Sequence, residues 1–111
     1  MKRRWFVVLC VAAALLPAAA RSDDAPDTVA AGRKLYTSLC ARCHGLNLVT
    51  SGIGYDLRTF PNGDKERFVR SVNKGVRAMP AWENVVKPDQ VDAIWAYIGS
   101  VNGWTDSKAA R

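Results

Sequence analysis

Apolar residues recur at helical spacing in the segment that begins at Asp27. Asp27 and Thr28 are both suitable N-caps, because their short side-chain oxygens accept hydrogen bonds from the free amides of a first turn. The stripe that follows approximates one face of a helix and consists of Val29, Leu35, Tyr36 and Leu39. The pattern predicts a helix that is already under way when the chain reaches Cys40.

Residues 62–75, NGDKERFVRSVNKG, have the same periodicity and indicate a middle helix. Asp64 is its expected N-cap and Gly75 its C-terminal stop. Its inward face is expected to consist of Phe68, Val69 and Val72.

Residues 87–103, KPDQVDAIWAYIGSVNG, indicate a last helix that begins with Pro88 in its first turn. Its buried residues are expected to be Val91, Ile94, Trp95 and Ile98. The chain has no internal repeat and no sign of a second domain, so the pattern as a whole predicts a single all-α domain.

The first twenty residues have the composition of an export signal. Lys2, Arg3 and Arg4 precede an apolar run that closes on three alanines at 18–20, which is the order of a secretory signal peptide. An uncleaved anchor is the alternative, but the run is shorter than the roughly 20 residues that a spanning helix needs. We therefore expect cleavage after Ala20, export to the periplasm and no stable membrane insertion afterwards.

Removal of residues 1–20 would change both the charge and the size of the chain. The signal contains three of the 16 basic residues and none of the 10 acidic ones, so the net charge falls from +6 to +3. Residues 21–111 are expected to form one domain with an ordered core at about 27–104. Such a small domain buries only about 60% of its unfolded surface, so a cofactor often contributes to its stability.

The segment CARCHG, residues 40–45, places Cys40, Cys43 and His44 within five positions. A structural zinc site needs a fourth ligand, and no other Cys or His follows residue 20. A dithiol oxidoreductase has its cysteines where a strand runs into a helix, whereas this segment continues a helix. A haem uses all three groups, because each thiol forms a thioether and the imidazole binds the iron. The spacing favours one covalently bound haem c.

Met79 is the single methionine that follows the signal, and it lies in RAMPAW, residues 77–82. A lone methionine usually fills a core, but Pro80 disfavours helix at Met79 and suits a side chain presented from an extended loop. We therefore predict that Met79 is the second axial ligand of the iron, opposite His44.

With these motifs the sequence resembles the class I c-type cytochromes over nearly all of residues 27–103. The family's first helix carries Gly, an aromatic residue and the first cysteine at four-residue steps, here Gly32, Tyr36 and Cys40. Its last helix carries an aliphatic residue and an aromatic one three apart, here Ile94 and Tyr97. The resemblance implies an all-α fold in which these two helices cross beside one haem.

One position departs from the wider family. Many members have a Gly-Pro segment whose proline carbonyl accepts the Nδ1 proton of the haem histidine, and this chain has Tyr55 at that place. The backbone carbonyl of any residue type can accept that proton. The stretches GYDLRTF and RAMPAW are similar to small periplasmic cytochromes that accept electrons from pyrroloquinoline-quinone (PQQ) alcohol dehydrogenases.

The expected function is therefore that of a soluble, monomeric electron carrier, not an enzyme, which takes electrons from a quinoprotein alcohol dehydrogenase or another exported redox enzyme. Its acceptor in the respiratory chain would be a terminal oxidase or another cytochrome, and nothing indicates nucleic-acid binding. A donor to an oxidase or peroxidase is one alternative, and a haem gas sensor or peroxidase in which Met79 is displaced is another.

Two further sets of residues are candidates for roles around the haem. Arg58 and the indole N–H of Trp82 are expected to bind the haem propionates, because buried carboxylates need hydrogen-bond donors or a cation. Arg67, Arg70 and Lys74 recur at helical steps in the middle helix, and Arg77 follows just before the loop that carries Met79. These four basic residues form either a docking surface for an acidic partner or an ordinary solvated face.

Overall fold

The computed structural model describes residues 26–60 and 64–104, and the predicted signal peptide lies outside these residues. The described residues contain no extended strand, which confirms the all-α prediction. The helical elements are α1 (Pro26–Leu35), η1 (Tyr36–Cys40), α2 (Ala41–His44), η2 (Leu46–Leu48), η3 (Leu57–Thr59), α3 (Lys65–Lys74) and α4 (Pro88–Asn102).

The first helix begins earlier than the sequence predicted. Pro26 is already helical, so Asp27 and Thr28 lie in the first turn and the prediction that one of them is the N-cap is wrong. Proline is favoured at this position because its fixed φ suits the first turn and no amide hydrogen bond is lost there. Asp27 still suits the first turn, since a carboxylate there is stabilised by the helix dipole.

A π-helical turn, η1, joins α1 to α2, so the chain remains helical from Pro26 to His44. A π turn holds more residues than an α turn, and it rotates the side chains that follow relative to those that precede it. Cys40 is the last residue of η1. The side chains of the CARCH segment therefore project in other directions, relative to those of α1, than they would from an uninterrupted α-helix.

Both later helices have the predicted ends. The Asp64 carboxylate accepts a hydrogen bond from the Arg67 amide at 3.1 Å, and α3 ends at Gly75, which has a φ of 74°. Pro88 opens α4, and Gly103 ends it in the left-handed conformation. The expected core residues of both helices are buried, except that Val69 is half-buried.

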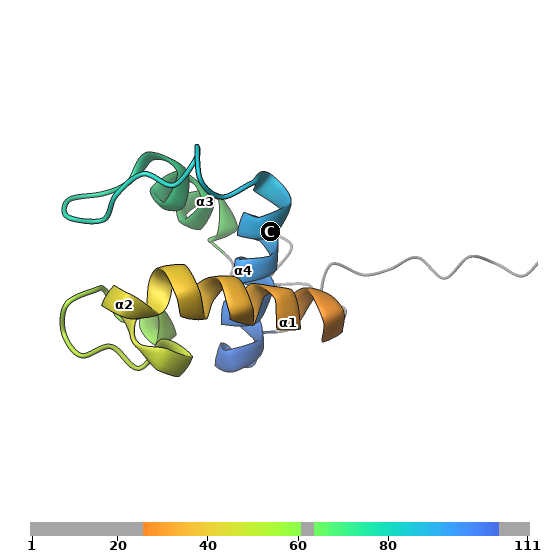
Figure 1. Ribbon diagram of the computed structural model, residues 1–111. Helices are drawn as coiled ribbons and strands as arrows, with labels where there is room; N and C mark the ends of the chain where they lie inside the picture. The colour runs from red at the N-terminus through yellow and green to blue at the C-terminus, as the bar shows by residue number, and fades with distance from the viewer. Residues whose placement is uncertain (1–25, 61–63, 105–111) are drawn as a thin grey trace, which may run out of the picture.

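Helices α1 and α4 cross where Gly32 meets the backbone of Ala93 (Figure 1). A Cβ atom on Gly32 would overlap the carbonyl group of Ala93. Tyr36 and Tyr97 lie against each other in the same interface, with ring centroids 5.2 Å apart. The close backbone approach that the Gly32 spacing predicted is therefore confirmed.

We expect Gly32→Ala to lower the free energy of unfolding by about 2 kcal/mol, because one of the two backbones must shift to admit the methyl group. Helix propensity alone predicts the opposite sign, a gain of about 1 kcal/mol. Urea denaturation of the haem-loaded protein measures the difference. Ala31→Ser, at the exposed neighbouring position, serves as the control, and a Gly32→Ala variant more stable than the wild type would contradict the packing.

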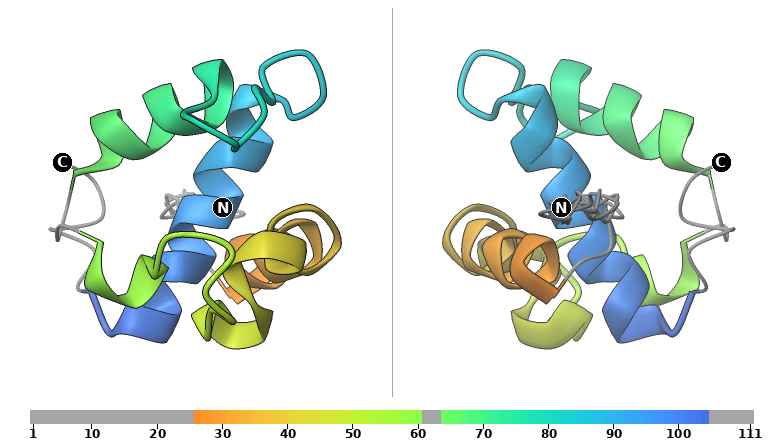
Figure 2. Two further views of the ribbon diagram at one scale, coloured as in Figure 1. Left: turned by 90° about the vertical axis from the view of Figure 1, so that its left-hand side faces the viewer. Right: turned by 90° about the vertical axis from the view of Figure 1, so that its right-hand side faces the viewer.

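The core lies along α4 and draws side chains from every other helix. Trp95 is its centre, with ring centroids 5.0 Å from Phe68 of α3 and 4.7 Å from Trp104. Figures 1 and 2 show α3 and the segment after it on one side of α4, and α1, α2 and the loop after His44 on the other. Both sides extend beyond α4 in the same direction.

Candidate functional site

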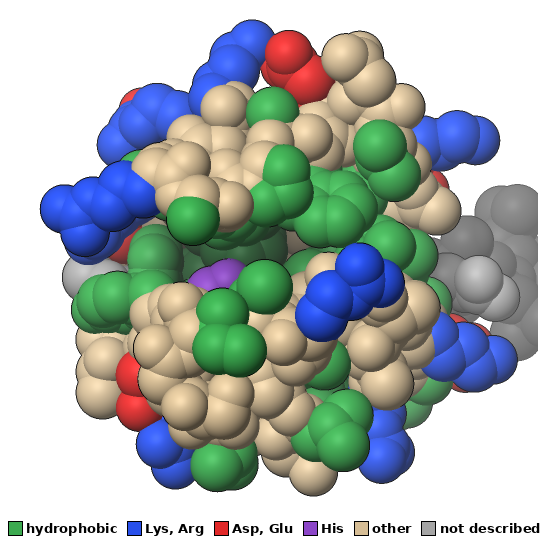
Figure 3. Space-filling model, turned by 60° about the vertical axis from the view of Figure 1, so that its left-hand side comes forward, with side chains coloured by type: hydrophobic (Ala, Val, Ile, Leu, Met, Phe, Trp, Pro, Cys, Tyr) green, Lys and Arg blue, Asp and Glu red, His purple; other side chains and the backbone are tan. Residues whose placement is uncertain are grey.

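A hollow separates these two sides of the molecule on the face shown in Figure 3. Its visible wall consists largely of hydrophobic side chains, and the single histidine of the sequence, His44, lies at its edge. An apolar hollow with one imidazole suits a planar apolar cofactor that is held by a metal–nitrogen bond.

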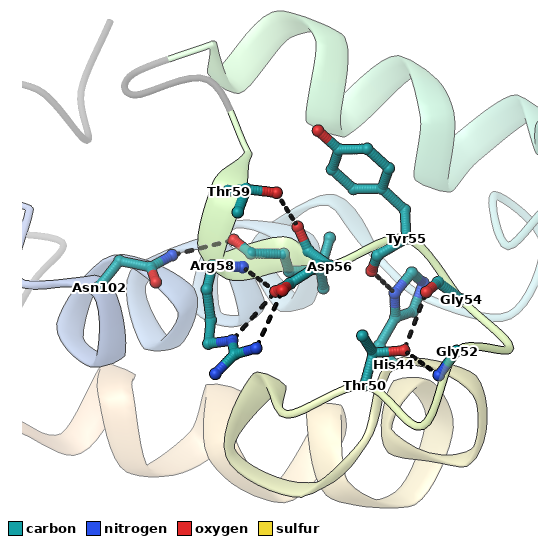
Figure 4. Close-up of polar contacts among 10 residues, drawn as sticks. His44, Thr50, Gly52, Gly54, Tyr55, Asp56, Arg58, Thr59 and Asn102 are labelled. Atoms are coloured by element: carbon teal, nitrogen blue, oxygen red, sulfur yellow. Dashed lines mark hydrogen bonds and ion pairs between the residues drawn. The ribbon is translucent and has the colours of Figure 1, made fainter.

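The His44 side chain is oriented by the loop that follows it. His44 is the last residue of α2, and its Nδ1 lies 2.8 Å from the carbonyl oxygen of Tyr55 (Figure 4). A carbonyl oxygen only accepts, so Nδ1 carries the proton and Nε2 keeps its lone pair free to bind a metal. The hydrogen bond expected at Tyr55 is thus present.

Gly54 is a site residue that the sequence reasoning missed. A Cβ atom at this position would lie 2.7 Å from the carbonyl oxygen of Cys43 and 2.9 Å from His44 Nδ1. The Gly54 amide also donates to that Cys43 carbonyl at 2.9 Å. The sequence contained a signal for this role, because a glycine directly precedes Tyr55, whose carbonyl was the candidate acceptor of the His44 proton.

Two tyrosine hydroxyls secure the turn that follows His44, and these roles also were not predicted. Tyr36 donates to the Gly45 carbonyl at 2.7 Å, and Tyr97 donates to the Asn47 side chain at 3.3 Å. Burial raises the pKa of Tyr36, so its hydroxyl remains a neutral donor. The crossing of α1 and α4 therefore fixes the backbone next to His44 as well as the core.

The two cysteines lie one turn apart, Cys40 half-buried and Cys43 exposed. Burial, with a contribution from the neighbouring Cys43, raises the pKa of the Cys40 thiol to about 11. A dithiol oxidoreductase needs a lowered thiol pKa, so the raised value disfavours that alternative. Among the described residues, no three Cys, His, Asp or Glu side chains gather as metal ligands.

Met79 lies in a tight turn that α3 holds in place. Val76 and Met79 exchange two backbone hydrogen bonds, of 3.1 and 3.0 Å, across a turn in which Arg77 has a φ of 53°. The Trp82 amide donates to the Val72 carbonyl at 2.8 Å, which ties the end of this loop to α3. Met79 is half-buried and packs against the core.

Arg58 and Trp82 come from different segments, η3 and the loop after α3. Arg58, in η3, pairs with Asp56 through Nε at 3.1 Å and a terminal nitrogen at 2.9 Å (Figure 4). Hydrogen bonds from the Arg58 side chain and amide lower the pKa of Asp56, so this pair is charged at neutral pH. Trp82, three positions after Met79 in the sequence, is half-buried.

Residues 27–98 match a family model described as cytochrome c oxidase, cbb3-type, subunit III. The chain belongs to the cytochrome c family. Among its curated relatives, this cytochrome is 34% identical over 79 residues to the quinohemoprotein alcohol dehydrogenase ADH IIB of Pseudomonas putida. That match covers 68% of the chain but 11% of the dehydrogenase, so the chain corresponds in length to a small part of that relative.

Other relatives match along most of their length. Cytochrome c6 of Thermosynechococcus vestitus is 30% identical, with 94% of this chain and 98% of the relative covered. The crystal structure of cytochrome cL from Methylophaga aminisulfidivorans has the same fold, with a TM-score of 0.61, 20% identity, and 80% and 69% of the two chains covered. The fold is that of the class I c-type cytochromes, as the resemblance implied.

This cytochrome is therefore an electron carrier related to the cytochrome domain of quinohemoprotein alcohol dehydrogenases, and its family binds haem c covalently. The residues present fit a haem, because two thiols one turn apart adjoin an imidazole with a free Nε2 at an apolar hollow. Within residues 26–60 and 64–104, no helix has the length and apolar character to cross a membrane.

Proposed function

We propose that this cytochrome is a soluble periplasmic electron carrier with one haem c, attached through Cys40 and Cys43 and ligated by His44 and Met79. The observation that carries this proposal is the hydrogen bond from His44 Nδ1 to Tyr55, because it leaves Nε2 available beside the hollow. When bound, a haem supplies an iron that takes up and releases one electron at a time. With two protein ligands it has no open position for substrate, so the protein is a carrier and not an enzyme.

Each side of the hollow has its own role in this proposal. The side that contains α1 and α2 would provide the two thiols for the thioethers and the imidazole for the iron. The other side provides the Met79 thioether, which favours ferrous iron and raises the reduction potential. The apolar side chains around them exclude water, which also disfavours the additional positive charge of ferric iron.

The proposed electron donor is a quinoprotein alcohol dehydrogenase. This choice is supported by the 34% identity to ADH IIB, in which a related cytochrome segment is part of a dehydrogenase chain. Electrons would then pass to a terminal oxidase or another cytochrome. The match to the cbb3-type oxidase subunit III family favours direct donation to an oxidase as the second candidate function.

Stopped-flow reduction of the purified ferric protein distinguishes these donors. We expect a quinoprotein alcohol dehydrogenase that is turning over its alcohol to reduce this cytochrome faster than other exported dehydrogenases at equal concentration. Similar rates with every donor would contradict the proposed partner. Similar rates together with rapid oxidation of the ferrous protein by a purified oxidase would favour the second candidate.

Of the four candidate basic residues, Arg70 and Lys74 each have a carboxylate partner. Lys74 pairs with Glu83 at 2.8 Å, Arg70 lies 3.7 Å from Glu66, and the Arg67 guanidinium lies 5.2 Å from the centre of the Phe60 ring. The two ion pairs weaken the field that would steer an acidic partner, whereas the ring contact leaves the charge of Arg67 in place. The ordinary solvated face is therefore the interpretation that the contacts favour.

We accordingly expect the second-order rate of reduction by the partner to change less than about threefold between low and high salt, because steering by a weak net field is small. Replacing Arg70, Lys74 and Arg77 by Gln should leave the rate nearly unchanged. A steep fall with salt that these replacements abolish would instead identify Arg70, Lys74 and Arg77 as part of a docking surface.

Arg58 and Trp82 remain candidates for the haem propionates. Asp56 uses two of the five N–H groups of Arg58, so three remain for another carboxylate. We expect Arg58→Leu and Trp82→Phe each to change the reduction potential and its dependence on pH, because each removes a donor from a partly buried carboxylate. Protein-film voltammetry from acid to alkaline pH measures both. If neither variant moves either quantity, these two residues serve only packing and the surface ion pair.

A further inference from the structure

The loop after residue 50 is closed by one side-chain hydroxyl. Thr50 Oγ1 donates to the Gly54 carbonyl at 2.9 Å and accepts a hydrogen bond from the Gly52 amide at 3.1 Å (Figure 4). Thr50 is half-buried, so water has limited access to these bonds. The loop contains two glycines, and Gly52 has a φ of 98°, so without this hydroxyl its backbone would have wide freedom.

The same hydroxyl fixes the peptide that leads to Tyr55. The Gly54 carbonyl and the Tyr55 amide belong to one planar unit. The Thr50 hydroxyl donates to the carbonyl of that unit. On the other side of Gly54, the Gly54 amide donates to the Cys43 carbonyl at 2.9 Å. The next carbonyl, that of Tyr55, is the one that accepts the His44 proton.

We propose that Thr50 is a positioning residue for His44, because its hydroxyl holds the peptide plane that aims the Tyr55 carbonyl at Nδ1. This inference rests on the proposed ligation of the iron by His44. A hydrogen bond at Nδ1 makes Nε2 a stronger donor to a metal and fixes the plane of the ring. Loss of the hydroxyl should therefore loosen that bond and raise the reduction potential.

Thr50→Val removes the hydroxyl at nearly constant volume. In NMR spectra of the reduced, haem-loaded protein, we expect the His44 Nδ1 proton to exchange with solvent up to about tenfold faster. This factor corresponds to the free energy of one ordinary hydrogen bond. The potential should rise, and Thr50→Ser, which keeps the hydroxyl, should behave as the wild type. Thr59→Val is the matched control, because Thr59 donates at 2.9 Å to the Asp56 carbonyl outside this loop.

A second variant tests the positioning directly. Proline at position 55 fixes the φ of the residue whose carbonyl accepts the proton, and among the described hydrogen bonds none is donated by the Tyr55 amide. Thr50→Val combined with Tyr55→Pro should therefore regain slow exchange and the wild-type potential, even if Thr50→Val alone does not fold.

The remaining outcomes would overturn the inference. Thr50 does not position His44 if the Nδ1 proton of Thr50→Val exchanges as slowly as in the wild type, or if Thr59→Val speeds its exchange equally. The same conclusion follows if the double variant does not regain slow exchange and the wild-type potential. A haem-loaded wild type whose iron is not bound by His44 would overturn the proposed function, and this inference with it.

Discussion

The double replacement of Cys40 and Cys43 by alanine is expected to leave a largely unfolded, protease-sensitive chain. Without the proposed thioethers a haem would lack its covalent attachment, and the apolar side chains that face the hollow would meet water. The free energy of unfolding of a small domain is about 5–15 kcal/mol. The free energy lost when these apolar side chains become exposed is expected to be comparable to that whole stability.

Circular dichroism and limited proteolysis of the exported chain test this expectation. Ser38→Ala, which alters an exposed hydroxyl one residue before Leu39, is the control and should leave a red, folded protein. A compact and helical double variant that contains no haem would show that the chain folds without its cofactor. If the wild type itself had no haem absorbance, the thiols would serve another purpose.

Met79→Ala is expected to open the sixth position of the iron. The reduction potential should fall by on the order of 0.1–0.3 V, a part of the roughly 0.8 V range that axial ligands set. Carbon monoxide and cyanide should bind quickly, whereas they bind the wild type slowly. An ordinary core methionine would instead change mainly the stability, since its removal leaves only a cavity.

Equilibrium redox titration and the weak near-infrared band of a methionine–iron bond distinguish these cases. Val76→Ala is the matched control, because Val76 belongs to the same turn and is exposed. An unchanged potential with the band intact would exclude Met79 as a ligand. A wild type that lacks the band would favour the gas sensor or peroxidase alternative.

The helices and their crossing could be predicted from the sequence, because their signals are local. Asp64, Gly75 and Pro88 determine helix ends through backbone chemistry that depends on few neighbours, and Gly32 marked the close approach to α4. The start of the first helix was placed too late because Asp27 is acceptable both as a cap and within a first turn.

The unpredicted features all depend on partners that are distant in sequence or on small backbone changes. The π turn at η1 has no signature in residue type, and the roles of the Tyr36 and Tyr97 hydroxyls require knowledge of which carbonyl or amide lies opposite. The pairing of Lys74 with Glu83 likewise follows from the path of the Met79 loop. Periodicity shows which face is buried, but it does not show which polar atoms meet there.

The contact between Gly32 and Ala93 joins positions that 60 residues separate. Closing so long a loop is slow compared with forming either helix, because chain entropy opposes it. In a chain that emerges from its N-terminus, the CARCH segment therefore appears well before α4 exists to cover α1. Under the proposed function, haem can therefore be attached to this segment before the last helix docks on α1.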